Sequence, residues 1–204
     1  MIPLPRLYAI ADASFGNPVH LARSLFEGGA RLVQIRNKVA GAGELLDQVK
    51  QVLSFAPAEA TVLVNDRVDV ALLSGAHGVH LGQDDLPAVY ARRILGTHTQ
   101  IGFSTHTLDQ ALKADLLAID YIAIGPIFPT QTKADASAVV GLERLRQICG
   151  RIQKPVVAIG GITVDRVPDV LATGARSVAV ISALLKTDDI AAETRRWIDY
   201  AGSV

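Results

Sequence analysis

The sequence predicts an α/β fold, a (β/α)8 TIM barrel that takes in residues 1–204 as one domain. Short β-branched apolar runs alternate with longer helical patterns, and these runs are continuous, as in parallel strands buried on both faces. Eight such runs leave about 25 residues per unit, enough for one strand, one helix and two short loops. No Ser-, Gly- or Pro-rich linker divides the chain. A doubly wound open sheet is the alternative architecture.

The predicted strands are short and apolar, and each is followed by a segment with helical spacing. The strands are expected at Leu7–Ala11, Leu32–Arg36, Thr61–Val64, Gly78–Leu81, Gln100–Phe103, Tyr121–Ile124, Val156–Ile159 and Ser177–Val180. Apolar faces at helical spacing predict helices at Pro18–Glu27, Glu44–Ser54, Arg67–Leu73, Leu86–Leu95, Leu108–Asp115, Leu142–Cys149, Val164–Ala172 and Ile190–Tyr200. Gly29, Gly75 and Gly174 each join a helix end to the next strand, where glycine is the expected helix stop.

Composition and charge exclude several classes of protein. With 50% hydrophobic and 20% charged residues the chain can bury a core, which excludes disorder. Twenty basic and twenty acidic residues give no net charge, and only 5% of residues are aromatic, so we expect neither a nucleic-acid nor a membrane partner. No apolar run approaches the roughly 18 residues of a membrane span, and no signal-peptide pattern is seen. A single Cys149 suits a reducing, cytoplasmic location.

Polar residues gather after the predicted strands, at the edge where barrels and open parallel sheets bind ligands. Gln34, Arg36 and Lys38 alternate with a period of two, so we expect all three on one face of an extended segment. The two cations suit an anionic ligand. A solvated strand end whose charges face water is the alternative.

Asp66 and Asp85 follow neighbouring predicted strands. Because such strands lie about 4.8 Å apart, both carboxylates can reach one Mg²⁺, whose remaining ligands would be phosphate oxygens. The alternative is helix N-capping, by Asp66 before the helix from Arg67 and by Asp84 or Asp85 before the helix from Leu86. The residues alone favour neither reading.

Two glycines and a serine point to phosphate binding. Gly160 and Gly161 follow the seventh predicted strand, and Ser182 follows the eighth. The loops at these positions hold a phosphate on backbone N–H groups in many barrels. The longest connection, Gly125–Gly141, contains Lys133, which is either a cation that closes over an anion or an exposed lysine. His80 lies within a strand, where we expect a hydrogen-bonded residue of the barrel lining rather than a base.

Six segments in this order resemble the thiamine-phosphate synthase family. They are Val33–Lys38, Val64–Asp69, Gly78–Leu86, Gly102–His106, Gly125–Lys133 and Ala158–Ile162. The resemblance implies a (β/α)8 barrel and a transferase. The reaction joins 4-amino-2-methyl-5-(hydroxymethyl)pyrimidine diphosphate to a thiazole phosphate, or to its carboxylated form, and releases pyrophosphate in thiamine biosynthesis.

The resemblance also implies roles for individual residues. Asp66 and Asp85 would hold one Mg²⁺ per subunit, and Arg36, Ser104 and Lys133 would be catalytic. The pyrimidine diphosphate would be bound by Gln34, Ile35, Arg36, Asn37, Lys38, Asn65, Ser104 and Lys133. The thiazole phosphate would be bound by Thr130, Gln131, Thr132, Gly161, Ile181 and Ser182. The sequence departs from the family at Asn37, where an acidic residue is usual, and at Ala11, where threonine is common before Asp12.

Other functions on the same barrel stay open. A thiazole tautomerase would need neither Mg²⁺ nor diphosphate, and a non-catalytic barrel would only bind thiamine phosphate; the retention of Asp66, Asp85 and Lys133 favours the synthase. A sugar-phosphate epimerase or aldolase would need an acid–base pair or a Schiff-base lysine on a strand. The expected partners are small-molecule substrates. Barrels of this kind often form homo-oligomers, but no interface stripe stands out in the sequence.

Overall fold

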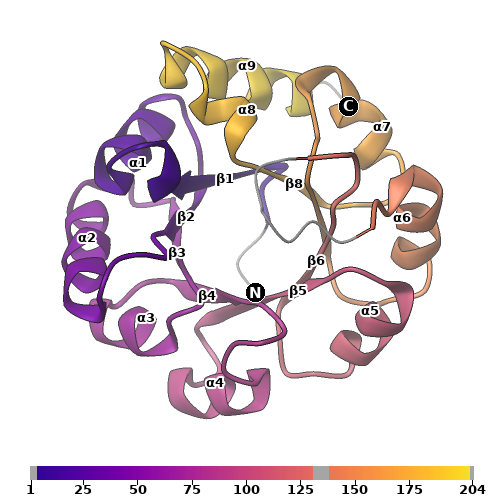
Figure 1. The fold of residues 1–204 in the computed structure, drawn as a ribbon, viewed down its shortest axis with the longest axis horizontal. Coiled ribbons are helices and arrows are strands. Elements are labelled where there is room, and N and C mark those ends of the chain that lie inside the picture. The colour runs from indigo at the N-terminus through magenta and orange to yellow at the C-terminus, as the bar shows by residue number, and fades with distance from the viewer. Residues whose placement is uncertain (1–3, 131–137, 203–204) are drawn as a thin grey trace.

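The structure, a computed structural model, describes residues 4–130 and 138–202. In the described residues, eight parallel strands pair in sequence order, and β8 pairs with β1 to close a barrel (Figure 1). The strands are β1 Leu7–Asp12, β2 Leu32–Arg36, β3 Thr61–Asn65, β4 Gly78–Leu81, β5 Gln100–Thr105, β6 Tyr121–Ile124, β7 Val156–Ile159 and β8 Ser177–Val180. The predicted barrel and its strands are confirmed, and the open-sheet alternative is wrong.

The helices form a ring outside the barrel (Figure 1). They are α1 Pro18–Glu27, α2 Ala42–Phe55, α3 Val68–Ser74, α4 Ala88–Leu95, α5 Leu108–Asp115, α6 Gly141–Cys149, α7 Val167–Leu171, α8 Ser182–Leu185 and α9 Ile190–Gly202. Two 3-10 turns, η1 at Ala13–Phe15 and η2 at Val164–Arg166, complete them.

Three helical predictions needed correction. The segment predicted as one helix, Val164–Ala172, is η2 followed by α7, because Pro168 lacks an N–H and is accommodated only in a first turn. Helix α4 begins at Ala88 rather than Leu86, with Pro87 in an extended conformation before it. The sequence gives no periodic signal for α8, which is only four residues long.

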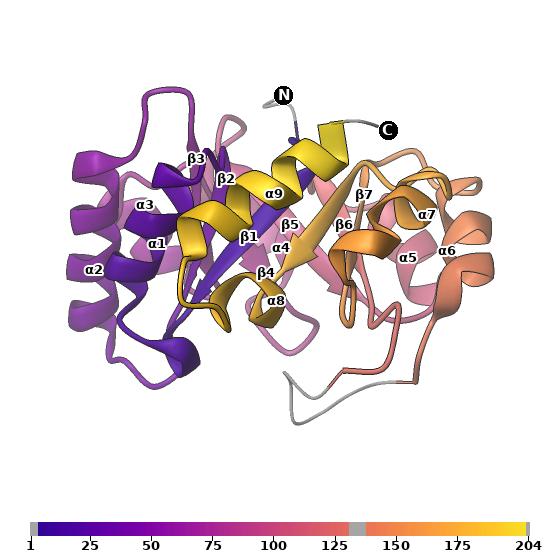
Figure 2. The same ribbon diagram turned by 90° about the horizontal axis from the view of Figure 1, so that it is seen from above.

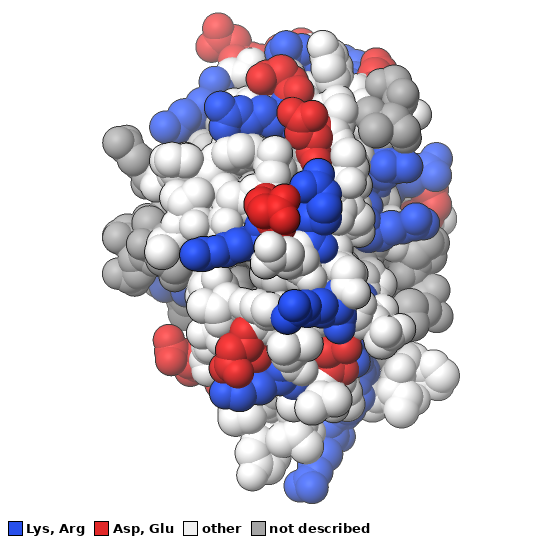
Figure 3. Space-filling view, turned by 90° about the vertical axis from the view of Figure 1, so that its right-hand side faces the viewer, with Lys and Arg blue, Asp and Glu red and all other residues white. Residues whose placement is uncertain are grey.

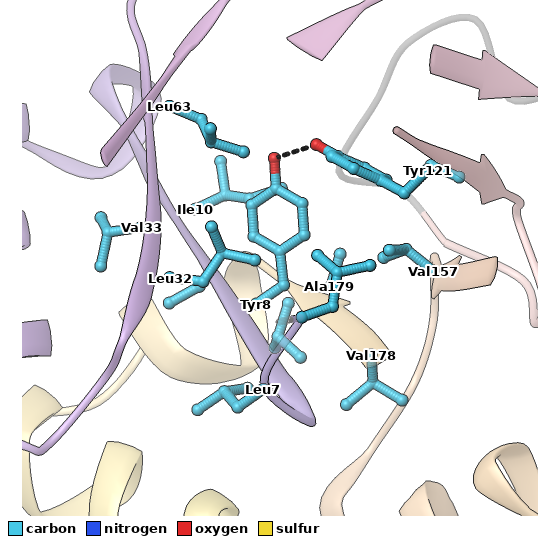
Figure 4. Close-up of a cluster of buried hydrophobic side chains, with 14 of the residues drawn as sticks. Leu7, Tyr8, Ile10, Leu32, Val33, Leu63, Tyr121, Val157, Val178 and Ala179 are labelled. Atoms are coloured by element: carbon cyan, nitrogen blue, oxygen red, sulfur yellow. Dashed lines mark hydrogen bonds between the residues drawn. The ribbon is translucent and has the colours of Figure 1, made fainter. Parts of the chain in front are cut away.

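The strands are buried on both sides, which explains their continuous apolar runs. Every residue of β1 and of β8 is buried, the inner side by the barrel interior and the outer side by the helices. Figure 4 shows Tyr8 and Tyr121 pointing toward each other inside the barrel, among Ile10, Leu63 and Val157. The interior is therefore a packed core that also contains hydroxyl groups.

The two ends of the barrel differ. Helix α8, directly after β8, lies at the end that is lower in Figure 2, where the strands finish, while α9 finishes at the opposite end. On the side that carries α6, Figure 3 shows acidic and basic side chains interspersed. In the described residues, no helix combines the length and the apolar character needed to cross a bilayer.

Candidate active site

A chain of hydrogen bonds crosses the barrel interior between β2 and β5. Gln34 Nε2 donates to Tyr8 Oη at 2.5 Å, and Tyr8 Oη lies 3.0 Å from Tyr121 Oη. Tyr121 Oη lies 2.8 Å from His80 Nδ1, and His80 Nε2 lies 2.8 Å from Ser104 Oγ. We call these five side chains the polar chain. It links two predicted site residues, Gln34 and Ser104.

The tyrosines of the polar chain are neutral hydroxyls. Burial raises the pKa of Tyr8 and that of Tyr121 far above the usual range, because the low-polarity interior disfavours a phenolate. His80 uses both ring nitrogens within the chain, which confirms it as a hydrogen-bonded lining residue. Sequence reasoning missed both tyrosines. One signal could have found Tyr8. It is an even number of residues from Asp12 on the same strand, so both side chains face the barrel interior.

Two adjoining cavities open at the ends of the strands. The first, here the β2 cavity, is lined by Tyr8, Ile10, Gln34, Arg36, Asn65, His80, Ser104, Ala123, Ile159, Ala179 and Ile181. The second, here the β7 cavity, is lined by Ser104–His106, Ala123, Gly125, Pro126, Thr130, Ile159–Ile162 and Ala179–Ala183. Both cavities are bounded by Ser104, Ala123, Ile159, Ala179 and Ile181. We call these five residues the shared wall, because the two cavities meet along it.

Each of the two predicted cations of the β2 segment has a carboxylate partner. Arg36 Nη1 donates to Oδ2 of Asp12, whose side chain is almost fully buried, and Lys38 Nζ lies 3.1 Å from Asp66 Oδ2. Asp12 is fixed in turn by the backbone N–H and hydroxyl of Ser14, at 2.9 and 2.7 Å. Arg36 is thereby held among buried groups, with a side chain only 17% exposed, whereas the Lys38 side chain is 58% exposed, so the functional role of Lys38 stays a prediction. After Tyr8 and Tyr121, Asp12 is a third residue to which sequence reasoning gave no role.

The structure excludes helix N-capping by the aspartates. Helix α3 has Arg67 as its N-cap and α4 has Pro87, and neither receives a side-chain capping bond. Asp66 instead has a φ of 62°, a left-handed conformation that is strained for a non-glycine residue. Asp85 Oδ2 accepts a hydrogen bond from the Gly82 N–H at 2.6 Å, and the two carboxyl groups face each other.

Burial raises the pKa of Asp85, and the neighbouring Asp66 carboxylate adds to this effect. Two carboxylates near Lys38 give hard oxygen donors, which suit Mg²⁺, an ion that also keeps waters and substrate phosphates as ligands. In the described residues no group of three or more ligating side chains gathers. The formal charges of Arg36, Lys38, Asp12, Asp66 and Asp85 leave one net negative charge among these five side chains.

The β7 cavity depends on two glycines. Gly160 and Gly161 have φ values of 98° and 65°, and a Cβ on Gly161 would lie 2.6 Å from Phe128 O and 2.5 Å from Pro129 O. The loop after β6 packs directly on them, since Phe128 N donates to Gly160 O at 3.0 Å. Only glycine allows this close approach. The approach positions Thr130 at the cavity, opposite Ser182 at the start of α8.

The remaining predicted site residues are placed as follows. The Ile35 side chain is fully buried, and the Asn37 amide donates to Gln48 Oε1 at 3.2 Å, on α2 and away from Lys38. Asn65 ends β3 and lines the β2 cavity. Gly161, Ile181 and Ser182 line the β7 cavity. Gln131, Thr132 and Lys133 lie outside the described residues.

Comparisons with known proteins agree with this geometry. The family model described as thiamine monophosphate synthase matches residues 7–184. A thiamine-phosphate synthase of Koribacter versatilis is 46% identical over 191 residues, which are 90% of each chain. One of Anaeromyxobacter dehalogenans is 44% identical over 190 residues, 93% of this chain and 85% of the relative.

A solved structure gives the same result. The thiamine phosphate pyrophosphorylase of Pyrococcus furiosus superposes with a TM-score of 0.90 at 38% identity, and the match covers 97% of this chain and 96% of the other. The family match spans most of the barrel, and the similarity to each relative extends over nearly the whole chain. The chain therefore belongs to the thiamine monophosphate synthase family, and its activity is thiamine-phosphate synthesis, a transferase reaction.

Proposed function

We propose that the transfer takes place beside the shared wall, where the two cavities meet, with the pyrimidine diphosphate in the β2 cavity and the thiazole phosphate in the β7 cavity. The bond between the pyrimidine methylene carbon and the diphosphate oxygen breaks, and its electron pair leaves with the diphosphate. The thiazole nitrogen then forms a bond to the same methylene carbon. The observation that supports this most is that one serine, Ser104, lines both compartments.

The pyrimidine ring is oriented by Gln34 and Ser104. The Gln34 amide nitrogen donates to Tyr8, which leaves its oxygen as an acceptor for an amino group of the ring. His80 lies 2.8 Å from Ser104 Oγ at the other end of the polar chain. Two fixed groups at opposite ends of a buried chain restrict the ring to one orientation, which lowers the entropic cost of reaching the transition state.

The diphosphate is bound at the mouth of the β2 cavity. Arg36, Lys38 and Asn65 supply donors, and Lys133, outside the described residues, is proposed as a further cation. Asp66 and Asp85 would hold Mg²⁺, which when bound offsets the negative charge of the departing diphosphate. Arg36 is held by Asp12, so its guanidinium is oriented before the substrate arrives.

The thiazole phosphate is bound in the β7 cavity. The backbone of Gly161, the hydroxyl of Ser182 and Thr130 line it, and we assign the phosphate to this region together with Gln131 and Thr132. Ile159 and Ile181, part of the shared wall, give the thiazole ring an apolar surface. The ring nitrogen would then face the methylene carbon where the two cavities meet, with no side chain between the two atoms, and the surrounding residues would exclude water that would otherwise capture the carbon.

The first experiment measures pyrophosphate release by the purified chain with both substrates and Mg²⁺. We expect release only when the thiazole phosphate and the metal are both present. Asp66→Ala, Ser104→Ala and Lys133→Ala are each expected to reduce it. A matched control is Ser54→Ala, since Ser54 is exposed on α2 and its hydroxyl donates to Gln51 O of the same helix.

Two results would contradict the proposal. Release that persists with a chelator would remove the role of Asp66 and Asp85. A wild-type chain that releases no pyrophosphate but interconverts thiazole phosphate tautomers would favour the tautomerase. A separate binding measurement with thiazole phosphate alone, in Gly161→Ala, tests the assignment of the β7 cavity without chemistry.

A further inference from the structure

We propose that two copies of this chain associate through the outer face of α3 and α4. The face is formed by Leu72, Leu73, Leu86, Val89, Tyr90 and Ile94, and we call these six residues the α4 face. Each of the six is between 38% and 65% exposed. In the part of the chain that the structure describes, about half of each side chain is left facing solvent.

Helix α4 is more apolar outside than its role in the barrel requires. It turns Ala88, Ala91 and Leu95 inward, at a spacing of three and four residues. The larger side chains Val89, Tyr90 and Ile94 are on its outside, and Tyr90 and Ile94 are four residues apart on one line of the helix. A helix that is apolar on both sides is normally covered on both sides.

The α4 face extends onto the neighbouring helix. Helices α3 and α4 pack against each other and lie side by side in the ring of Figure 1. Leu72 and Leu73 are exposed in the last turn of α3. The exposed apolar residues therefore stand on two neighbouring helices that pack against each other.

The size of this surface matches one half of a stable interface. Six large apolar side chains that are each about half exposed present roughly 600 Å², which is the upper limit for the largest patch on a typical monomer. A standard interface buries about 800 Å² per partner, of which about 500 Å² is apolar in homodimers. The α4 face supplies that amount from residues of one chain.

A second copy is the occupant that charge and symmetry favour. A two-fold interface uses the same patch on both copies, so one apolar surface is enough to build it. The chain has no net charge, so two copies are not repelled as they approach. Arg93, whose guanidinium lies 5.7 Å from the Tyr90 ring, gives the face a charged edge.

The position of the α4 face also concerns the active site. Leu86 directly follows Asp85 in the loop between β4 and α4, and Asp66 lies two residues before α3. The loop with Asp66 thus leads into α3, and the loop with Asp85 leads into α4. A second copy would restrict the motion of these loops.

The test is the mass of the full chain in solution, measured by sedimentation from about 1 to 100 µM, since self-association depends on concentration. We expect a particle of twice the mass of one chain. The double variant with Tyr90→Glu and Ile94→Glu would place unpaired charges in the interface, so we expect its dimer dissociation constant to rise by roughly 100-fold or more. The matched control is Tyr200→Glu, because Tyr200 is exposed to a similar extent on α9, across the barrel.

A second measurement uses only the wild-type chain, so its result does not depend on whether the double variant folds. Amide hydrogen exchange of the wild-type chain should be slower in α3 and α4 at high than at low concentration. A wild-type chain that is a monomer over the whole range would overturn the proposal. So would a double variant that stays dimeric, or concentration-dependent protection confined to other helices.

Discussion

The hydroxyl oxygens of Tyr8 and Tyr121 lie 3.0 Å apart inside the barrel, although 113 residues separate them in the sequence. Closure of the barrel brings the first and sixth strands to face each other across the interior. The contact joins the Gln34 end of the polar chain to the His80 and Ser104 end. A substitution at either tyrosine therefore affects the hydrogen bonds of Gln34 at one end of the polar chain and of His80 and Ser104 at the other.

Tyr121→Phe should destabilise the fold. It leaves Tyr8 Oη and His80 Nδ1 without a bond that they make in the wild type, and a buried unsatisfied group costs about 1–3 kcal/mol. We expect a lower melting temperature by about 3–10 °C in thermal unfolding. Tyr200→Phe, at a half-exposed position on α9, is the matched control and should lower the melting temperature less. An unchanged Tyr121→Phe variant would show that the polar chain contributes nothing to stability.

Arg36→Met should unfold more easily than a variant that also carries Asp12→Asn. The single change leaves a buried carboxylate without its cation, at a cost of about 3–5 kcal/mol, while the double change removes the charge as well. Urea unfolding of the two variants and of the wild type gives the comparison. Equal losses in both variants would mean that the ion pair is not what holds Asp12.

Ser104→Ala should lower kcat/KM for thiamine-phosphate formation by roughly 10- to 100-fold, the effect of losing one good hydrogen bond of about 1.5–3 kcal/mol in the transition state. The reason is that Ser104 lines both cavities. Steady-state kinetics with each substrate varied in turn measures this. If only the KM of one substrate rises, Ser104 contacts that substrate alone and the shared-wall interpretation fails.

Gly161→Ala should raise the KM for thiazole phosphate at least tenfold. A methyl group there would collide with Phe128 O and Pro129 O at a φ of 65°, so the loop after β6 must move away from the cavity. Gly41→Ala is the matched control, since a Cβ at Gly41 meets nothing within 4 Å and its φ is −67°. Normal thiazole phosphate binding in Gly161→Ala would contradict the assigned position of that substrate.

Asp85→Asn should stabilise the metal-free protein at neutral pH. Burial raises the pKa of Asp85 in the folded state, so keeping it ionised above that pKa costs stability, and the cost disappears as the pH falls toward the unfolded value of about 3.9. The asparagine can still accept the Gly82 N–H bond. Melting temperatures of both proteins across pH in a chelating buffer should differ most at neutral pH and converge in acid. A constant difference would indicate that the charge of Asp85 is not the cause.

Local patterns in the sequence determined the architecture and the positions of most strands. Continuous apolar runs such as Val156–Ile159 identify strands buried on both faces, and eight of them in 204 residues leave room for little else than a barrel. Because ligands bind where the strands of such a fold end, the same patterns located the neighbourhood of Gln34, Asp66 and Gly161. The resemblance to a family then supplied the chemistry.

Contacts between distant segments were decided by the tertiary structure. The pairing of Arg36 with Asp12 depends on the register between β1 and β2, and the bond between Tyr8 and Tyr121 depends on strands that face each other only when the barrel closes. The left-handed conformation of Asp66, which excludes N-capping, depends on the N–H bond it makes to His80 O on β4, at 2.8 Å. The local hydrophobic pattern determines which residues form strands. Which polar groups bond to each other depends on side chains that come together from distant parts of the chain.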